Sequence, residues 1–195
     1  VSKWLSISTL GFYGFAVGLV SKGGIVPNSL VNAAFPALSA SVANRKKSEW
    51  VEQYQKLQDL CCYLSVPVFA AMAMLGIVVT GFVFNDEIVR MLWLPLLILS
   101  IGQLMSSMLY VPAWLTFAMK KPELSLKTNL LAVIIVVPPI FYLIYNYGLL
   151  GAAFSPALYC LWQFAYFIPR IYKECLQSSP LDWYLRSGGM SAMGC

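Results

Sequence analysis

Apolar residues in this chain fall in long runs that do not alternate with polar residues at a period of two. Runs of about twenty apolar residues cross the hydrocarbon core of a bilayer as helices, whereas the strands of a membrane barrel would alternate. The pattern therefore predicts an all-α, polytopic transmembrane helical bundle within residues 1–175. We expect about five spans, over residues 11–42, 57–84, 88–119, 124–147 and 149–170.

Two segments outside these spans have patterns of their own. An apolar stripe at helical spacing runs through the charged stretch that precedes the second span, and it predicts an amphipathic helix at the membrane interface. The stripe consists of Trp50, Tyr54, Leu57 and Cys61. Residues 176–195 are polar at first and then rich in Ser, Gly and Met, so we expect a disordered cytoplasmic tail.

Each predicted span contains at least one proline. A proline leaves one backbone carbonyl without its helical donor, and in lipid that carbonyl needs a neighbouring group or cavity water. Prolines in every span favour a protein that bends or lines a cavity, although kinks of this kind also serve helix packing alone.

The composition is that of a membrane protein rather than a soluble domain. Only 11% of the 195 residues are charged, whereas about a quarter of the residues are charged in a typical soluble domain. The chain has no histidine, and its five cysteines include no CxxC pair, so His-based catalysis is excluded and a metal site is not expected. We expect no enzymatic activity and no cofactor. The net charge of +5 is too modest to indicate a nucleic-acid partner.

Basic residues predict the orientation of the bundle. Most of the thirteen fall on one side of the predicted spans, while Lys3 and Arg90 fall on the other and Lys22 lies within the first span. Short loops rich in Lys and Arg stay in the cytoplasm, so the C-terminus is expected to be cytoplasmic. The residues on the basic side are Arg45, Lys46, Lys47, Lys56, Lys120, Lys121, Lys127, Arg170, Lys173 and Arg186.

Lys22 is the first candidate functional residue. It lies eleven residues after Gly11, which places it about 16 Å further along a helix and deep in the hydrocarbon. A charge at that depth usually marks a functional site, here contact with an anionic headgroup or an ion-coupling site. The alternative is a structural lysine that snorkels or pairs with a carboxylate elsewhere. Small residues on the same helical face are Gly18, Ser29 and Ala33.

Two polar stripes at helical spacing supply the other candidates. The third span carries Ser100, Gln103, Ser107, Tyr110 and Trp114, and the fifth carries Ser155, Tyr159, Gln163, Tyr166 and Arg170. Amide, hydroxyl and aromatic groups together suit a sugar, but they equally suit hydrogen bonds between helices. The candidate substrate-binding residues, in addition to Lys22, are Gln103, Ser107, Tyr110, Tyr159, Gln163 and Tyr166.

The order of several short motifs resembles a known family. LGFYGF and VPNSLVNAAFPALSAS precede the charged stretch, and NYGLLGAAFS precedes the last span; Phe35-Pro36 and the YGxxGAA of Tyr147–Ala153 are the most specific. Across about residues 1–175 the chain resembles the polysaccharide-specific flippases, the O-antigen and capsule repeat-unit exporters of the multidrug/oligosaccharidyl-lipid/polysaccharide superfamily. The ending Ser187–Cys195 departs from the tails of that family.

The resemblance implies a function and a larger assembly. Members of the family have about twelve spans or more, in two six-helix bundles around a central cavity, and work by alternating access. They move an undecaprenyl-pyrophosphate-linked oligosaccharide across the bacterial inner membrane. This chain resembles the second bundle without most of its first helix, so an N-terminal lobe and membrane lipid are its expected partners. Lys22 would take the role of the cationic cavity residues of the family.

Three other functions stay open. A cation-coupled drug exporter of the same superfamily would be expected to carry a carboxylate inside the membrane. A membrane-embedded glycosyltransferase or polymerase would need a catalytic acid or base at an interfacial loop, and the candidate is Asp86-Glu87, beside Arg90, in a short outer loop. The chain could also be an inactive fragment of a longer protein.

Overall fold

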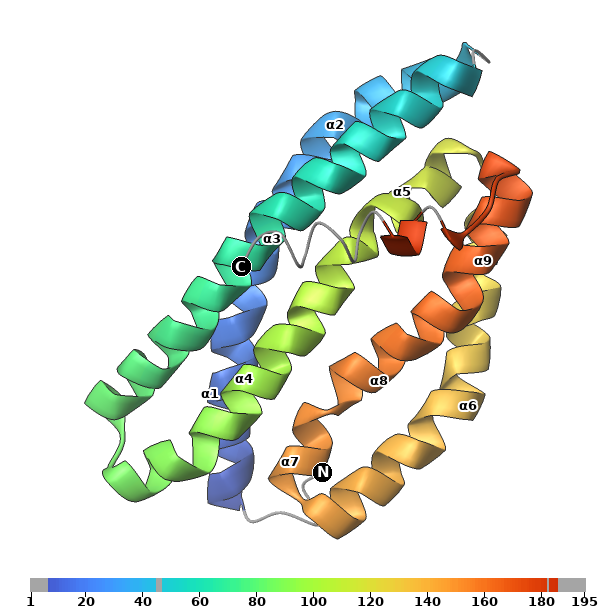
Figure 1. The fold of residues 1–195 in the computed structure, drawn as a ribbon. Coiled ribbons are helices and arrows are strands. Elements are labelled where there is room, and N and C mark those ends of the chain that lie inside the picture. The colour runs from blue at the N-terminus through green and yellow to red at the C-terminus, as the bar shows by residue number, and fades with distance from the viewer. Residues whose placement is uncertain (1–6, 45–46, 182, 186–195) are drawn as a thin grey trace.

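The computed structural model describes residues 7–44, 47–181 and 183–185, and these residues form helices joined by short turns, without a strand (Figure 1). The predicted all-α polytopic bundle is therefore confirmed. Four helices in the described part of the chain are long and apolar enough to cross a membrane. They cover Leu10–Ala43, Lys47–Val83, Asp86–Ala118 and Pro122–Tyr147.

The first predicted span is one rod with a tighter turn near its middle. It comprises α1 (Ile7–Ser21), the 3₁₀ turn η1 (Lys22–Gly24) and α2 (Ile25–Ala43). The two glycines of η1 are buried, and a Cβ atom at Gly23 would lie 2.9 Å from the Phe69 ring. Because glycine has no side chain, these two positions let the first rod approach the helix that carries Phe69 closely at the 3₁₀ turn.

The predicted interfacial helix is not a separate element. It forms the first part of α3 (Lys47–Val83), a single helix of 37 residues. Its apolar stripe is buried in one core cluster with residues of α2 and of the last rod, for example Val31 and Ile168. The stripe therefore faces protein instead of a membrane surface, which corrects the expected placement.

The third predicted span is α4 (Asp86–Met108) followed by α5 (Tyr110–Ala118), with a turn at Leu109 between them. α3 packs along α4, where a Cβ at Gly76 would lie 3.2 Å from Leu96. The fourth is α6 (Pro122–Tyr147), a helix that continues through Pro138 and Pro139 without a break.

The fifth predicted span is a rod made of short segments, which is why it is not among the four long helices. Gly148, with a φ angle of 56°, turns the chain from α6 into this rod. A Cβ at Gly151 would lie 2.0 Å from the Leu143 carbonyl oxygen, so the two helices meet backbone to backbone. The segments are α7 (Leu149–Ala153), α8 (Ser155–Trp162), the π-helix η2 (Gln163–Phe167), α9 (Ile168–Ile171) and the π-helix η3 (Tyr172–Leu176).

The connections sort to two ends of the bundle. Figure 1 shows the end of α2, the α5–α6 connection and the end of the last rod at one end, and the α3–α4 and α6–α7 connections at the other. At the first end, Lys121 Nζ donates to the Glu174 carbonyl at 2.9 Å and Lys47 Nζ donates to Gln177 Oε1 at 3.2 Å. The described members of the basic side thus gather at one end. Arg45, Lys46 and Arg186 lie outside the described residues.

The start of the expected tail folds back onto the bundle. Trp183 is only 4% exposed, and its ring centroid lies 5.3 Å from that of Phe164. The hydroxyl group of Tyr184 donates to the carbonyl of Phe164. Two large aromatic side chains in a polar segment favour burial over disorder. The rest of the expected disordered tail, Ser187–Cys195 included, lies outside the described residues.

Candidate functional site

Lys22 lies on an open surface of the first rod. Its side chain is exposed, and within the part of the chain that the structure describes it has no ion-pair or hydrogen-bond partner. Gly18, Ser29 and Ala33 are exposed on the same side of the rod, as the sequence predicts. A Cβ at Gly18 would meet nothing within 4 Å, so there is unfilled space on that side of the charge. Three and four residues after Lys22 the rod carries the larger exposed side chains of Ile25 and Val26.

Tyr110 comes close to the turn that carries Lys22. A Cβ at Gly24 would lie 3.1 Å from the hydroxyl oxygen of Tyr110, so this half-buried tyrosine contacts η1. Gln103 is half-buried on α4, seven residues before Tyr110 and on the other side of the turn at Leu109. The first group, at the junction of α1 and α2, therefore comprises Lys22 on the exposed side of η1 and Tyr110 against the buried Gly24.

Ser107 is positioned differently from the other candidates. Its side chain is fully buried, and its hydroxyl group donates to the carbonyl of Leu104 in the same helix at 2.7 Å. That hydroxyl is committed to its own helix, so Ser107 is not available to a substrate in this arrangement.

A second group joins the fifth rod to α6. The Tyr159 hydroxyl donates to Asn129 Oδ1 at 2.8 Å, and Gln163 Nε2 donates to the same oxygen at 3.0 Å. Gln163 Nε2 also lies within hydrogen-bond distance of the Tyr159 hydroxyl. Gln163 is 6% exposed, and its Oε1 has no hydrogen-bond partner in the described structure. Two predicted residues thus meet at an amide, Asn129, that sequence reasoning missed.

An aromatic ladder continues from this group toward the basic end. Trp162 and Tyr166 are stacked, with ring centroids 4.9 Å apart, and the guanidinium carbon of Arg170 lies 4.6 Å from the centroid of Tyr166. Trp162 Nε1 donates to the carbonyl of Thr128 on α6 at 3.3 Å. The ladder spans η2, a π-helical segment, and such segments occur often at functional sites.

The two groups differ in chemistry. The first offers an exposed cation, which suits a phosphate or another anion. The second offers amides, hydroxyls and flat aromatic faces, which suit a sugar. No hydrogen bond within the described residues joins the two groups.

No protein-family model, curated protein or solved structure matches this chain. The resemblance to the polysaccharide flippases accordingly rests on the sequence motifs alone. What the structure establishes is an all-α membrane protein with polar groups on its interrupted helices.

Proposed function

We propose that this chain is part of a transporter that moves a lipid-linked oligosaccharide, of the undecaprenyl-pyrophosphate type, across the bacterial inner membrane. Transport occurs by alternating access against a second lobe that lies outside this sequence. The C-terminus is cytoplasmic in this proposal, because the basic end of the bundle faces the cytoplasm.

The observation that carries the proposal is the unpaired, exposed charge of Lys22 far from both ends of its rod. At 1.5 Å per residue it lies about 18 Å from Leu10 and about 31 Å from Ala43, so it is well inside the hydrocarbon. Charges at that depth face water, protein or a ligand of opposite charge. A pyrophosphate carried through a wet cavity meets this requirement.

The second group supports the glycan part of the proposed substrate. Sugars present hydroxyl groups at their edges and C–H groups on their faces, and the Asn129–Tyr159–Gln163 group with the neighbouring Trp162–Tyr166 stack matches both. Gln163 Oε1 is an acceptor without a partner in the described structure, and because it is buried, a substrate hydroxyl reaches it only when the helices move apart.

The interruptions in the rods support a protein that changes shape. The 3₁₀ turn at Lys22 and the π-helical segments of the last rod are irregular backbone inside long apolar helices. In transporters such irregular segments lie beside substrate sites and absorb the motion between states.

Most of the described acidic residues favour this proposal over a cation-coupled exporter. These lie toward helix ends, for example Asp86 and Glu87 at the start of α4 and Glu123 at the start of α6. Asp59 is the exception, because it lies twelve residues from the start of α3, about 18 Å along the helix. An exporter driven by cations would use a carboxylate at mid-depth of the spans.

Substitution of Lys22 in the full-length protein of the native host tests the proposal. Lys22→Ala should sharply reduce surface polysaccharide, whereas Lys22→Arg should largely retain it because the charge is kept. Lys127→Ala is the matched control, since Lys127 is an exposed lysine near the basic end that pairs with Glu123 at 3.9 Å. Equal protein abundance is verified by immunoblot. Wild-type polymer levels in the Lys22→Ala strain would refute the proposal.

A further inference from the structure

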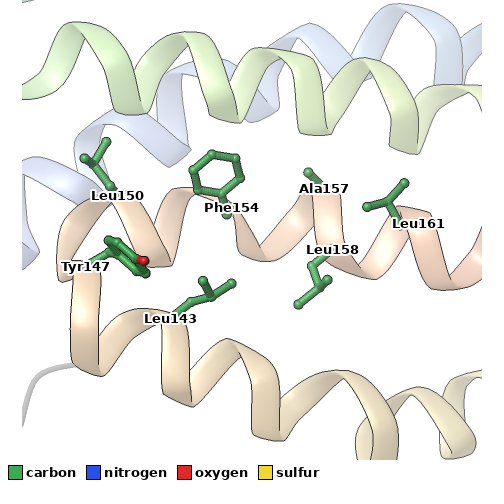
Figure 2. A pocket seen from close by; sticks show the side chains of 7 residues that line it. All are labelled: Leu143, Tyr147, Leu150, Phe154, Ala157, Leu158 and Leu161. Carbon is green, nitrogen blue, oxygen red and sulfur yellow. The ribbon is translucent and has the colours of Figure 1, made fainter.

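A hollow of about 440 Å³ lies between α6 and the α7–α8 segment, on the outside of the bundle. Figure 2 shows its walls: the apolar side chains of the last rod point into it from one side, and Leu143 and Tyr147 of α6 close the other. Its lining is carbon apart from the Tyr147 hydroxyl group. The residues of the last rod that line it are Leu150, Phe154, Ala157, Leu158 and Leu161.

This groove and the polar group lie on opposite sides of the last rod. Phe154 and Gln163 are nine residues apart, which is about 180° around a helix at 100° per residue. α8 packs against α4 on one flank and α6 on the other, so it separates the two sides (Figure 1). A ligand held by Gln163 therefore does not share a compartment with the groove.

The size of the groove selects its occupant. Its walls extend from Leu150 to Leu161, a length of about 17 Å, and a helix about 10 Å across would fill roughly 1300 Å³ over that length. The groove is too small to enclose a helix, and an extended peptide would leave its backbone polar groups without partners against carbon walls. A single hydrocarbon chain satisfies both conditions.

We propose that the groove holds one acyl chain of a membrane glycerophospholipid. Tyr142, Tyr145 and Tyr147 are exposed around the end of α6, where tyrosines mark the boundary between the hydrocarbon and the headgroups. A chain that enters beside Tyr147 thus keeps its headgroup at the interface. The inference does not rest on the proposed transport function, because the groove lies away from Lys22 and from the polar group.

Photo-crosslinking in proteoliposomes tests this site. The full chain is reconstituted with phosphatidylglycerol that carries a diazirine in the middle of one acyl chain, and adducts are mapped by peptide mass spectrometry. We expect adducts concentrated on residues 150–161 and on Leu143. Ala157→Phe, which fills the groove, should reduce them to the level found on other lipid-facing helices. The matched control is Ala71→Phe on the exposed side of α3, which should leave them unchanged.

A second variant and a second probe complete the test. Phe154→Ala widens the groove and should increase adduct formation there, so the proposal remains testable even if Ala157→Phe fails to fold. A prenyl phosphate with the same diazirine is the second probe, and it distinguishes a prenyl chain from an acyl chain as the occupant. The proposal would be overturned if all lipid-facing helices were labelled to the same extent, or if neither groove variant changed the labelling. Stronger labelling of the groove by the prenyl probe than by the phospholipid would also overturn it.

Discussion

The side-chain amide of Gln58 donates a hydrogen bond of 3.0 Å to the backbone carbonyl of Met108. Met108 lies four residues before Pro112, so its carbonyl is the one that the proline deprives of a helical donor. Gln58 is 3% exposed and lies on α3, a different helix. A neighbouring side chain therefore satisfies the carbonyl that a proline frees inside the bundle.

The same arrangement recurs at Pro156. Its freed carbonyl belongs to Ala152, and it accepts hydrogen bonds from the Tyr13 hydroxyl at 3.0 Å and from the Ser155 hydroxyl at 2.7 Å. At both prolines, the backbone carbonyl that lacks a helical donor accepts a hydrogen bond from a side chain of another helix. This supports the explanation that these kinks serve helix packing. At these two positions the freed carbonyl does not depend on cavity water.

The first prediction concerns Gln58 and Pro112. Gln58→Leu should destabilise the protein in detergent, because the Met108 carbonyl loses its donor in a dry environment. In a Pro112→Ala background the new backbone N–H supplies that donor. There, Gln58→Leu should lower the free energy of unfolding by about 1 kcal/mol less than it does in the wild-type background. Thermal unfolding of the four proteins, followed by tryptophan fluorescence, measures the coupling. If the effects of Gln58→Leu and Pro112→Ala on stability were strictly additive, the hydrogen bond from Gln58 to the Met108 carbonyl would not replace the backbone hydrogen bond that Pro112 removes.

The second prediction concerns Gly151, the central glycine of the YGxxGAA motif. A Cβ there would lie 2.0 Å from the Leu143 carbonyl oxygen, and backbone cannot yield as a side chain does. Gly151→Ala should cost at least about 3 kcal/mol or prevent folding. Gly81→Ala is the control, because a Cβ at Gly81 meets nothing within 4 Å. Size-exclusion chromatography and thermal unfolding report the difference, and equal stability of the two variants would contradict the close packing of α6 and α7.

The third prediction concerns the polar group. Asn129→Leu removes the acceptor shared by Tyr159 and Gln163, so it should destabilise the protein by about 1–2 kcal/mol. Tyr159→Phe should add little in that background, because the hydroxyl has already lost its acceptor. Leu126→Ala, an exposed position of the same helix, is the control and should change stability only slightly. Additive effects of Asn129→Leu and Tyr159→Phe in thermal unfolding would disprove their coupling.

The fourth prediction concerns Cys175 in η3, beyond the last predicted span. Burial raises the pKa of its thiol, and Glu174 adds to the rise while Lys121 opposes it. The folded state therefore favours the neutral thiol. This contribution to stability is fully present below the pKa of an unfolded thiol, about 8.5, and is lost as the pH rises from that value through the raised pKa of the folded state. At pH 7 Cys175 should react with maleimide far more slowly than the exposed cysteine of a Ser178→Cys variant, as peptide mass spectrometry can measure. Equal rates would contradict the burial of Cys175.

Helix positions could be predicted because long apolar runs determine them locally. The stripe from Trp50 to Cys61 was also visible, but periodicity shows only that one side of a helix is covered. Whether protein or membrane covers it depends on packing with residues far along the chain, such as Ile168. For this reason the stripe was wrongly placed at the membrane interface.

The candidate site shows the same limit. Tyr159 and Gln163 share a helical face and were found by spacing, whereas Asn129 lies 30 residues before Tyr159 on another helix. A single amide such as Asn129 in an apolar run indicates a polar contact, but the sequence does not show that its partners are Tyr159 and Gln163. Ser107 was selected by the same spacing rule, yet its hydroxyl is bound to its own helix.

The last prediction concerns orientation. Asn44 and Asn85 are exposed at opposite ends of the bundle, and Asn85 makes no side-chain cap on α4, so a cysteine there removes no cap. Because Lys47 and Lys121 gather at the end of Asn44, that end should be cytoplasmic. In intact cells a membrane-impermeant maleimide should label an Asn85→Cys variant and not Asn44→Cys, and lysis should make both react. Labelling of Asn44→Cys in intact cells would invert the orientation, and the basic end would then face the exterior.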